Sequence, residues 1–123
     1  MRSQKVFVLG VGAQKAGTSW LHHQLTSRAD TDFGFLKEYH IFNALFHPEY
    51  ECFKPKKFAP WKRKTRKRNR FIKKPERYFH TFTEGLKRKD ILLTGDITPS
   101  YACLTPSTYQ LIRSEFEKRN ILT

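Results

Sequence analysis

Residues 5–21 read KVFVLGVGAQKAGTSWL and combine an apolar run, a glycine-rich turn and the beginning of a helical pattern. The run from Lys5 to Gly10 is rich in β-branched and aromatic residues, which is typical of a strand buried on both faces of a parallel sheet. The glycines that follow let the backbone turn sharply before a helix that we expect to begin at Thr18. A strand, a tight turn and a helix in this order form the repeating unit of α/β folds.

Further strands and helices alternate along the rest of the chain. Short apolar runs predict additional strands at residues 33–36, 91–94 and, in its first residues only, 121–122. Apolar residues at helical spacing predict helices at residues 18–30, 75–86 and 105–118, and residues 41–46 are expected to form a brief helix or turn. In three of these helices the side chains expected to face the core are Leu21, Leu25, Ala29, Phe79, Phe82, Leu86, Leu111, Ile112 and Phe116. The predicted fold class is α/β, a parallel sheet with flanking helices.

The composition fits one folded domain. The chain has 123 residues, of which 38% are hydrophobic and 15% aromatic, too many for a disordered segment. It has two cysteines, Cys52 and Cys103, which exclude a disulfide scaffold, and we expect both to be reduced thiols. The longest apolar stretch, residues 6–13, is far shorter than the roughly 20 residues of a membrane-spanning helix. The sequence therefore predicts a soluble, cytoplasmic protein without a membrane span.

Positive charge is concentrated in one segment. The formal net charge is +13, and thirteen Lys and Arg residues with one acid, Glu76, lie between Lys54 and Arg77. Because like charges repel and three prolines interrupt the segment, we expect a mobile basic loop inserted at about residues 47–75. Such a loop either attracts a polyanion, such as nucleic acid, an anionic glycan or a membrane surface, or is a solvated loop without a partner. The charge pattern leaves both interpretations open.

The turn at residues 10–18 has the features of a site for a phosphate or sulfate ester. A helix N-terminus presents unpaired backbone amides and a partial positive charge, and glycines let the backbone approach an anion closely. Lys15 adds a full positive charge, and the hydroxyls of Thr18 and Ser19 add donors. Nucleoside triphosphatases place the lysine directly after the last glycine, whereas Lys15 precedes Gly17 by two residues. The alternative is a structural glycine-rich connection with a surface lysine.

Three segments resemble motifs of the sulfotransferase family and occur in the family's order. Residues 14–21, QKAGTSWL, resemble its Gln-Lys-x-Gly-Thr-Thr/Ser-Trp-Leu loop for the 5′-phosphosulfate. Residues 35–42, FLKEYHIF, are similar to the Lys-Glu-x-His-Phe-Phe segment of glycan-type and bacterial members, and residues 95–101, GDITPSY, to their Gly-Glu-Lys-Thr/Ser-Pro-x-Tyr segment. Ile97 departs from the lysine that glycan-modifying enzymes often have. The resemblance covers nearly the whole chain and implies a P-loop NTPase-like sulfotransferase fold.

The resemblance also implies a reaction and a cofactor site. The family transfers a sulfuryl group from 3′-phosphoadenosine 5′-phosphosulfate to a hydroxyl or amine, and this reaction needs no metal. Lys15 is then expected to stabilise the leaving phosphate. The expected cofactor-binding residues are Gln14, Lys15, Ala16, Gly17, Thr18, Ser19 and Trp20, the last packed near the nucleotide. The acceptor is left open and includes an anionic glycan.

A general base has to remove the proton of the acceptor. Related enzymes use the glutamate of the second segment, so Glu38 is the first candidate and His40, with an ordinary pKa of about 6.5, is the second. Lys37 is expected to approach the sulfate. The alternatives are a surface pair of Glu38 with Lys37 and a structural role for His40. The third segment supplies the substrate-side candidates Asp96, Thr98 and Ser100.

The family's remaining cofactor residues have no counterpart in the chain. Family members bind the 3′-phosphate through an arginine and a serine on a strand and helix that would follow Thr123. We therefore expect residues 1–123 to be the N-terminal portion of a longer sulfotransferase domain, with weak cofactor binding and little or no turnover. Two other function classes stay open: a small basic protein that binds nucleic acid or another polyanion, and a P-loop kinase or nucleoside triphosphatase with an unusual loop.

Overall fold

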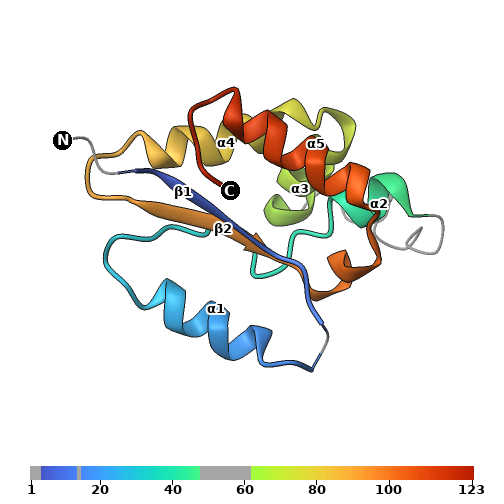
Figure 1. The fold of residues 1–123 in the computed structure, drawn as a ribbon, viewed down its shortest axis with the longest axis horizontal. Helices are drawn as coiled ribbons and strands as arrows, with labels where there is room; N and C mark the ends of the chain where they lie inside the picture. The colour runs from blue at the N-terminus through green and yellow to red at the C-terminus, as the bar shows by residue number, and fades with distance from the viewer. Residues whose placement is uncertain (1–3, 14, 48–61) are drawn as a thin grey trace.

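The computed structural model describes residues 4–13, 15–47 and 62–123. They form a mixed α/β fold in which helices flank a two-stranded parallel sheet (Figure 1). In chain order the elements are β1 (Val6–Gly10), α1 (Thr18–Thr26), α2 (Phe42–Phe46), α3 (Arg63–Lys73), α4 (Glu76–Leu86), β2 (Leu93–Ile97), the 3₁₀ helix η2 (Pro99–Cys103) and α5 (Pro106–Glu117). Within these residues no helix combines the length and the apolar character that crossing a bilayer requires.

The strands β1 and β2 form the parallel pair that the alternation of elements predicts. Val6 lies opposite Leu93 at the start of the paired segment. Single-residue bridges continue the sheet on both sides, since Leu122 also pairs with Val6 and Thr31 with Leu93. The strand predicted at residues 91–94 thus begins two residues later, at Leu93, and the strand start predicted at residues 121–122 is present as one bridge.

The prediction of a strand at residues 33–36 is wrong. Gly34 has a φ of 77°, a left-handed conformation that regular strands do not contain, and its amide donates to Asp32 Oδ1 at 2.8 Å. The turn directs the chain away from the sheet after Thr31. Phe33 is buried nonetheless, and its ring meets the ring of His22 edge-on, with 5.7 Å between the centroids. The apolar run therefore indicated burial but not strand geometry.

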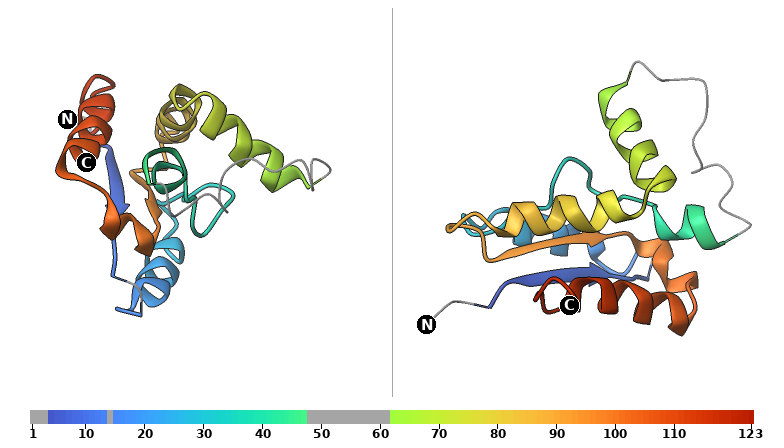
Figure 2. Two further views of the ribbon diagram at one scale, coloured as in Figure 1. Left: turned by 90° about the vertical axis from the view of Figure 1, so that its right-hand side faces the viewer. Right: turned by 90° about the horizontal axis from the view of Figure 1, so that it is seen from above.

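Helices α4 and α5 lie on one face of the sheet and α1 lies on the other (Figures 1 and 2). Phe7 of β1 is fully buried beneath α4 and α5. Its ring stacks on Phe116 with 4.0 Å between centroids and meets Phe82 edge-on at 5.1 Å. Because successive side chains of a strand point to opposite faces, the neighbours of Phe7 on β1 face α1 and stay half-buried. The prediction that β1 is buried on both faces is therefore wrong.

Helix α1 covers its face of the sheet loosely. It begins at Thr18, as predicted, but ends at Thr26 instead of near residue 30. None of its nine residues is buried, and Leu21, predicted to face the core, is 38% exposed. The amphipathic pattern is weak here because histidines and other polar residues separate the apolar positions.

The inward faces of the later helices follow the predicted spacing. Three predicted core residues of α4 are buried: Phe79, Phe82 and Leu86. In α5, Ile112 and Phe116 are buried, but Leu111 is 43% exposed, contrary to the prediction. Residues 112 and 116 are four apart and share one face of the helix, whereas residue 111 lies about 100° around the helix from residue 112.

The prediction of a basic loop at about residues 47–75 is wrong over α3. Residues 63–73 form a helix of eleven residues, and residues 48–61 lie outside the described part of the chain. Lys and Arg are good helix formers, and no proline interrupts the sequence between Pro60 and Pro75. Phe71 and Ile72 are buried at the end of α3, whereas most of its cations are exposed to solvent, where ions screen their repulsion.

Candidate functional site

The glycine loop, residues 11–17, connects β1 to α1. Gly17 caps α1 with a φ of 86°, and Lys15 has a φ of 59°. Left-handed conformations at both positions turn the chain abruptly from the strand into the helix. Lys15 and Ala16 are exposed, while Gln14, also predicted to bind the cofactor, lies outside the described residues.

The N-terminus of α1 leaves its first amides free of helical partners. No side chain caps the helix, and its first turn holds no acidic residue. The amide of Leu21 donates to Gly17 O at 3.0 Å and so begins the helical bonding. The amides of Thr18, Ser19 and Trp20 precede it and lie at the positive end of the helix dipole.

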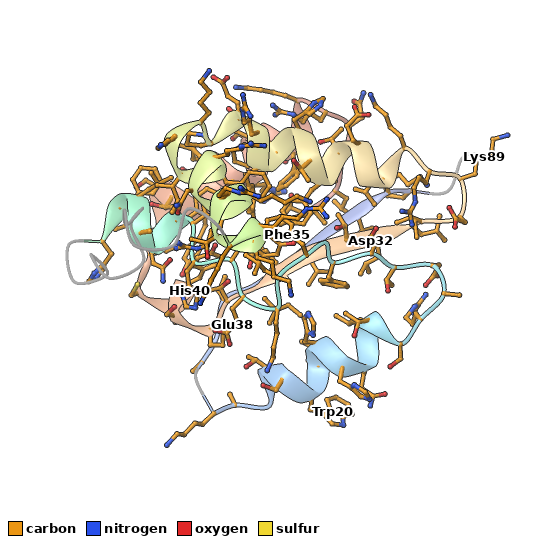
Figure 3. The ribbon with its side chains drawn as sticks, turned by 180° about the vertical axis from the view of Figure 1, so that it is seen from behind. Trp20, Asp32, Phe35, Glu38, His40 and Lys89 are labelled. Carbon is orange, nitrogen blue, oxygen red and sulfur yellow. The ribbon has the colours of Figure 1, made fainter. Side chains whose placement is uncertain are left out.

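One pocket brings parts of the three sequence motifs together. It has a volume of about 390 Å³. The residues that line it are Lys15, Gly17, Thr18 and Ser19 of the first motif, Glu38 of the second and Pro99 of the third. In Figure 3, Glu38 lies between His40 and the turn that leads into α1. The pocket thus has a cation, hydroxyls and a helix N-terminus on one side and a carboxylate on another.

Lys37 links the second motif directly to the first. Its Nζ donates to Ser19 Oγ at 2.7 Å. Trp20, in contrast, does not line the pocket: its side chain is 67% exposed and points outward from α1 (Figure 3). The residues of the predicted loop motif are therefore divided between the pocket and the outer surface of the helix.

Glu38 and His40 form a contact at the edge of this pocket. His40 Nε2 lies 3.0 Å from Glu38 Oε2, and the imidazole is mostly buried while the carboxylate is partly exposed. Burial lowers the pKa of His40 below its ordinary value, an effect that Glu38 partly offsets. Glu38 thus contacts His40, and Lys37 donates to Ser19. The surface pair of Glu38 with Lys37, the alternative interpretation of these two residues, is not formed.

Neighbouring groups determine which nitrogen of His40 carries the hydrogen. Asn43 Oδ1 accepts the amide of Ala44 at 3.0 Å, which orients the Asn43 side chain so that its Nδ2 faces His40 Nδ1, also at 3.0 Å. An amide nitrogen only donates, so Nδ1 is the acceptor and neutral His40 carries its hydrogen on Nε2. That hydrogen is donated to Glu38. Ser100 Oγ also lies 3.2 Å from Nδ1.

Asp96 is the centre of a buried network behind this pair. Its side chain has no exposed surface and accepts hydrogen bonds from Tyr78 at 2.8 Å, Tyr101 at 2.8 Å and Thr98 at 2.6 Å. Burial raises the pKa of Asp96 to about 6, although these bonds oppose the rise. Thr98 Oγ1 in turn accepts the amide of Tyr39 at 3.0 Å. The predicted substrate-side residues Asp96, Thr98 and Ser100 thus support the second motif from behind.

Two residues of this arrangement were missed by the sequence analysis. Asn43 is completely buried, and its signal was a single polar residue in the apolar run at residues 41–46. Arg68 of α3 donates to the backbone carbonyls of Tyr39 and His40 at 2.7 and 2.6 Å. Nothing in the run of cations distinguished Arg68 from its neighbours.

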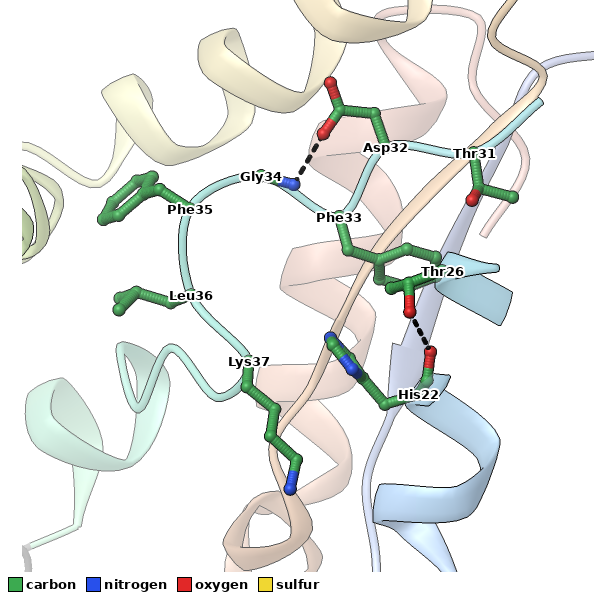
Figure 4. A pocket seen from close by; sticks show the side chains of 9 residues that line it. All are labelled: His22, Thr26, Thr31, Asp32, Phe33, Gly34, Phe35, Leu36 and Lys37. Carbon is green, nitrogen blue, oxygen red and sulfur yellow. Dashed lines mark hydrogen bonds between the residues drawn. The ribbon is translucent and has the colours of Figure 1, made fainter. Parts of the chain in front are cut away.

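A second pocket of about 330 Å³ lies between α1 and residues 31–37 (Figure 4). His22 and Lys37 both line it. His22 Nε2 is buried and has no hydrogen-bond partner within the described part of the chain. Burial lowers the pKa of His22, and the charge of Lys37 lowers it further. Lys37 also donates to Ser19, which lines the pocket of the glycine loop.

Among residues 4–13, 15–47 and 62–123, no group of three or more His, Cys, Asp or Glu side chains is arranged to hold a metal ion. Comparison of the chain with protein-family models, with curated proteins and with solved structures finds no match.

Proposed function

We propose that the chain belongs to a sulfotransferase that moves a sulfuryl group from 3′-phosphoadenosine 5′-phosphosulfate to a hydroxyl or amine acceptor, on a P-loop NTPase-like fold. The observation that supports this most is the shared pocket of Lys15, the start of α1 and Glu38. In the proposed reaction the groups that bind phosphate and the group that accepts the proton line the same cavity, as in-line group transfer requires.

The glycine loop provides the donor side of the proposed reaction. The amides of Thr18 and Ser19, together with their hydroxyls, bind the 5′-phosphate at the helix N-terminus. Lys15 stabilises the negative charge that grows on the oxygen between phosphorus and sulfur as the sulfur–oxygen bond breaks. This charge is larger in the transition state than in the bound donor, so the lysine lowers the barrier more than it strengthens binding of the donor.

Glu38 provides the acceptor side. Its carboxylate takes the proton of the attacking hydroxyl or amine while the acceptor atom bonds to sulfur, and the bonding electron pair leaves with the phosphate oxygen. His40 donates to Glu38 through Nε2 and holds the carboxylate in place. Because Nδ1 faces Asn43 and Ser100, we assign the base to Glu38 and a positioning role to His40.

The acceptor proposed is anionic, with a glycan as the leading class. Helix α3 carries no acidic residue, and it contacts the Glu38–His40 segment through Arg68. The cations exposed on it are Arg63, Lys64, Arg66, Arg70 and Lys73. A polyanionic acceptor that approaches Glu38 is attracted by this helix.

A nuclear magnetic resonance titration of the chain with 3′-phosphoadenosine 5′-phosphate tests the proposal. The amides of Gly17, Thr18 and Ser19 should shift first. In Lys15→Ala these shifts should need about tenfold more nucleotide or more, whereas Lys64→Ala on α3 should leave the titration unchanged. The test depends on which amides shift and not on the affinity, so weak binding of the nucleotide is sufficient. Shifts at the loop with MgATP but not with the 3′-phosphorylated nucleotide would instead favour a kinase or nucleoside triphosphatase.

The array of exposed cations on α3 also favours a second candidate, a protein whose function is to bind nucleic acid or another polyanion. Such binding should weaken steeply between low and physiological salt and should survive Lys15→Ala. Binding of the unmodified chain and of Lys15→Ala to a DNA duplex and to heparin, measured over a range of salt concentrations, separates this candidate from the first.

A further inference from the structure

Arg68 differs from the other cations of α3 in where its charge is directed. Its guanidinium is half-buried, with Nε donating to Tyr39 O at 2.7 Å and Nη2 donating to His40 O at 2.6 Å. Two hydrogen bonds from one planar group to consecutive carbonyls fix the orientation of both peptide planes. Arg66 and Arg70, its neighbours in sequence, are exposed.

The backbone that Arg68 holds has an unfavourable conformation. His40 has a φ of 51°, in the left-handed region that residues with a side chain rarely adopt. Such a conformation persists only where the surroundings determine it from several directions. The amide side of this segment is held by the residues that follow β2, since Tyr39 N donates to Thr98 Oγ1 and Ile41 N donates to Tyr101 Oη of η2, both at 3.0 Å. Arg68 holds the carbonyl side.

We propose that Arg68 is a positioning residue of the candidate site: by binding the carbonyls of Tyr39 and His40, it keeps the Glu38–His40 pair on the pocket that Lys15 lines. The assignment gives part of the basic segment a role that is distinct from attracting a polyanion. Its meaning for catalysis rests on the proposed sulfuryl transfer, but the positioning itself is a property of the free chain.

The two hydrogen bonds also explain why residue 68 is an arginine and not a lysine. A lysine ammonium keeps the charge but lacks the planar fork that reaches two consecutive carbonyls at once. The positive charge alone is therefore not sufficient, and Arg68→Lys should lose most of the positioning. This separates a geometric role of Arg68 from a purely electrostatic one.

Amide hydrogen exchange of the free chain tests the inference with Arg68→Ala, Arg68→Lys and, as a matched control, Arg66→Ala. In the Arg68 variants the Tyr39 amide should exchange about tenfold faster, the loss expected for one net hydrogen bond. The Phe7 amide of β1 donates to Leu122 O, away from the Arg68 contacts, so it serves as the reference and should change much less. Nitrogen chemical shifts of His40 should at the same time lose the signature of a hydrogen fixed on Nε2.

Equal acceleration at Tyr39 and Phe7 in both Arg68 variants, or unchanged His40 shifts, would overturn the inference. If Arg68→Ala prevents folding, Arg68→Lys decides the question, because it keeps the charge and the length of the side chain. Nucleotide binding at the glycine loop is recorded on the same samples. Its absence from the unmodified chain counts against the proposed function and leaves the result for Arg68 intact.

Discussion

His40 Nε2 lies 3.0 Å from Glu38 Oε2, and both side chains come from one short segment whose backbone turns through a left-handed residue. The two side chains lie two positions apart in a segment where His40 has a φ of 51° and where hydrogen bonds with Arg68 and Thr98 hold the backbone. The chemistry proposed for Glu38 depends on this contact and on the groups that orient His40.

Asn43→Asp should change the hydrogen placement on His40. The amide that faces Nδ1 becomes a carboxylate, which accepts hydrogen bonds, so Nδ1 must carry a hydrogen and the charged imidazolium is favoured. We expect the pKa of His40 to rise by about one unit or more. A proton titration followed by magnetic resonance measures it, with Asn69→Asp on α3 as the control. An unchanged His40 titration in Asn43→Asp would contradict the assigned hydrogen bonding.

Asp96 should make the stability of the fold depend on pH. Burial raises its pKa from 3.8 to about 6 in the folded chain, so between these values the folded chain binds a proton that the unfolded chain has released. The free energy of unfolding therefore falls as pH rises from about 4 to about 6, by about 3 kcal/mol, and this dependence ends above pH 6. Stability should thus be greatest on the acidic side of this window.

Asp96→Asn isolates this effect. Asparagine does not ionise, but it offers one acceptor oxygen to three hydroxyl donors, so we expect a loss of about 1–3 kcal/mol at neutral pH. Urea unfolding of the unmodified chain and of Asp96→Asn between pH 4 and pH 7.5 measures the free energy of unfolding of each. The account of Asp96 fails if the two stability curves run parallel through this range.

Lys15→Ala should weaken binding of 3′-phosphoadenosine 5′-phosphate by about tenfold or more, since it removes a charge-assisted contact to phosphate. Stability should change by less than about 0.5 kcal/mol, because the side chain is exposed. Calorimetric titration measures the affinity, with the exposed Lys64→Ala as the control. Equal affinities of the two variants would remove Lys15 from the site.

Phe116→Ala should be among the most damaging substitutions in the chain. Phe116 is fully buried and stacks on Phe7, so its truncation should cost about 3–5 kcal/mol. Leu111→Ala on the same helix removes a side chain that is 43% exposed and should cost far less. Thermal and urea unfolding of the two variants gives the comparison. Similar losses for both would show that α5 packs through a different face.

The sequence predicted elements best where one local signal was strong. The change from strand to helix at Gly17 and Thr18 is marked by glycines that have left-handed conformations in the structure. The α4 stripe repeats aromatic residues at helical spacing, and its three expected core residues are buried. Such signals depend on neighbours in the sequence, so the sequence alone is sufficient to find them.

The predictions that failed concern residues whose structure depends on contacts with distant parts of the sequence. The run after Asp32 looks like a strand, but its place is determined by Gly34 and by what Phe33 packs against. The network that supports Glu38 joins residues about 30 to 60 positions apart, such as Arg68 with Tyr39 and Thr98 with Tyr39. Hydrogen bonds across such separations leave no pattern in the order of residues, so Arg68 and Asn43 were missed, and the supporting contacts of Thr98 and Asp96 were not predicted although both residues were named as candidates.

A crystal structure of the chain soaked with 3′-phosphoadenosine 5′-phosphate tests the central claim most directly. The account predicts the 5′-phosphate at the amides of Gly17, Thr18 and Ser19, with Lys15 Nζ in contact with a phosphate oxygen and Glu38 across the same pocket. A nucleotide bound elsewhere, or a Lys15 side chain directed into solvent beside a bound phosphate, would contradict it.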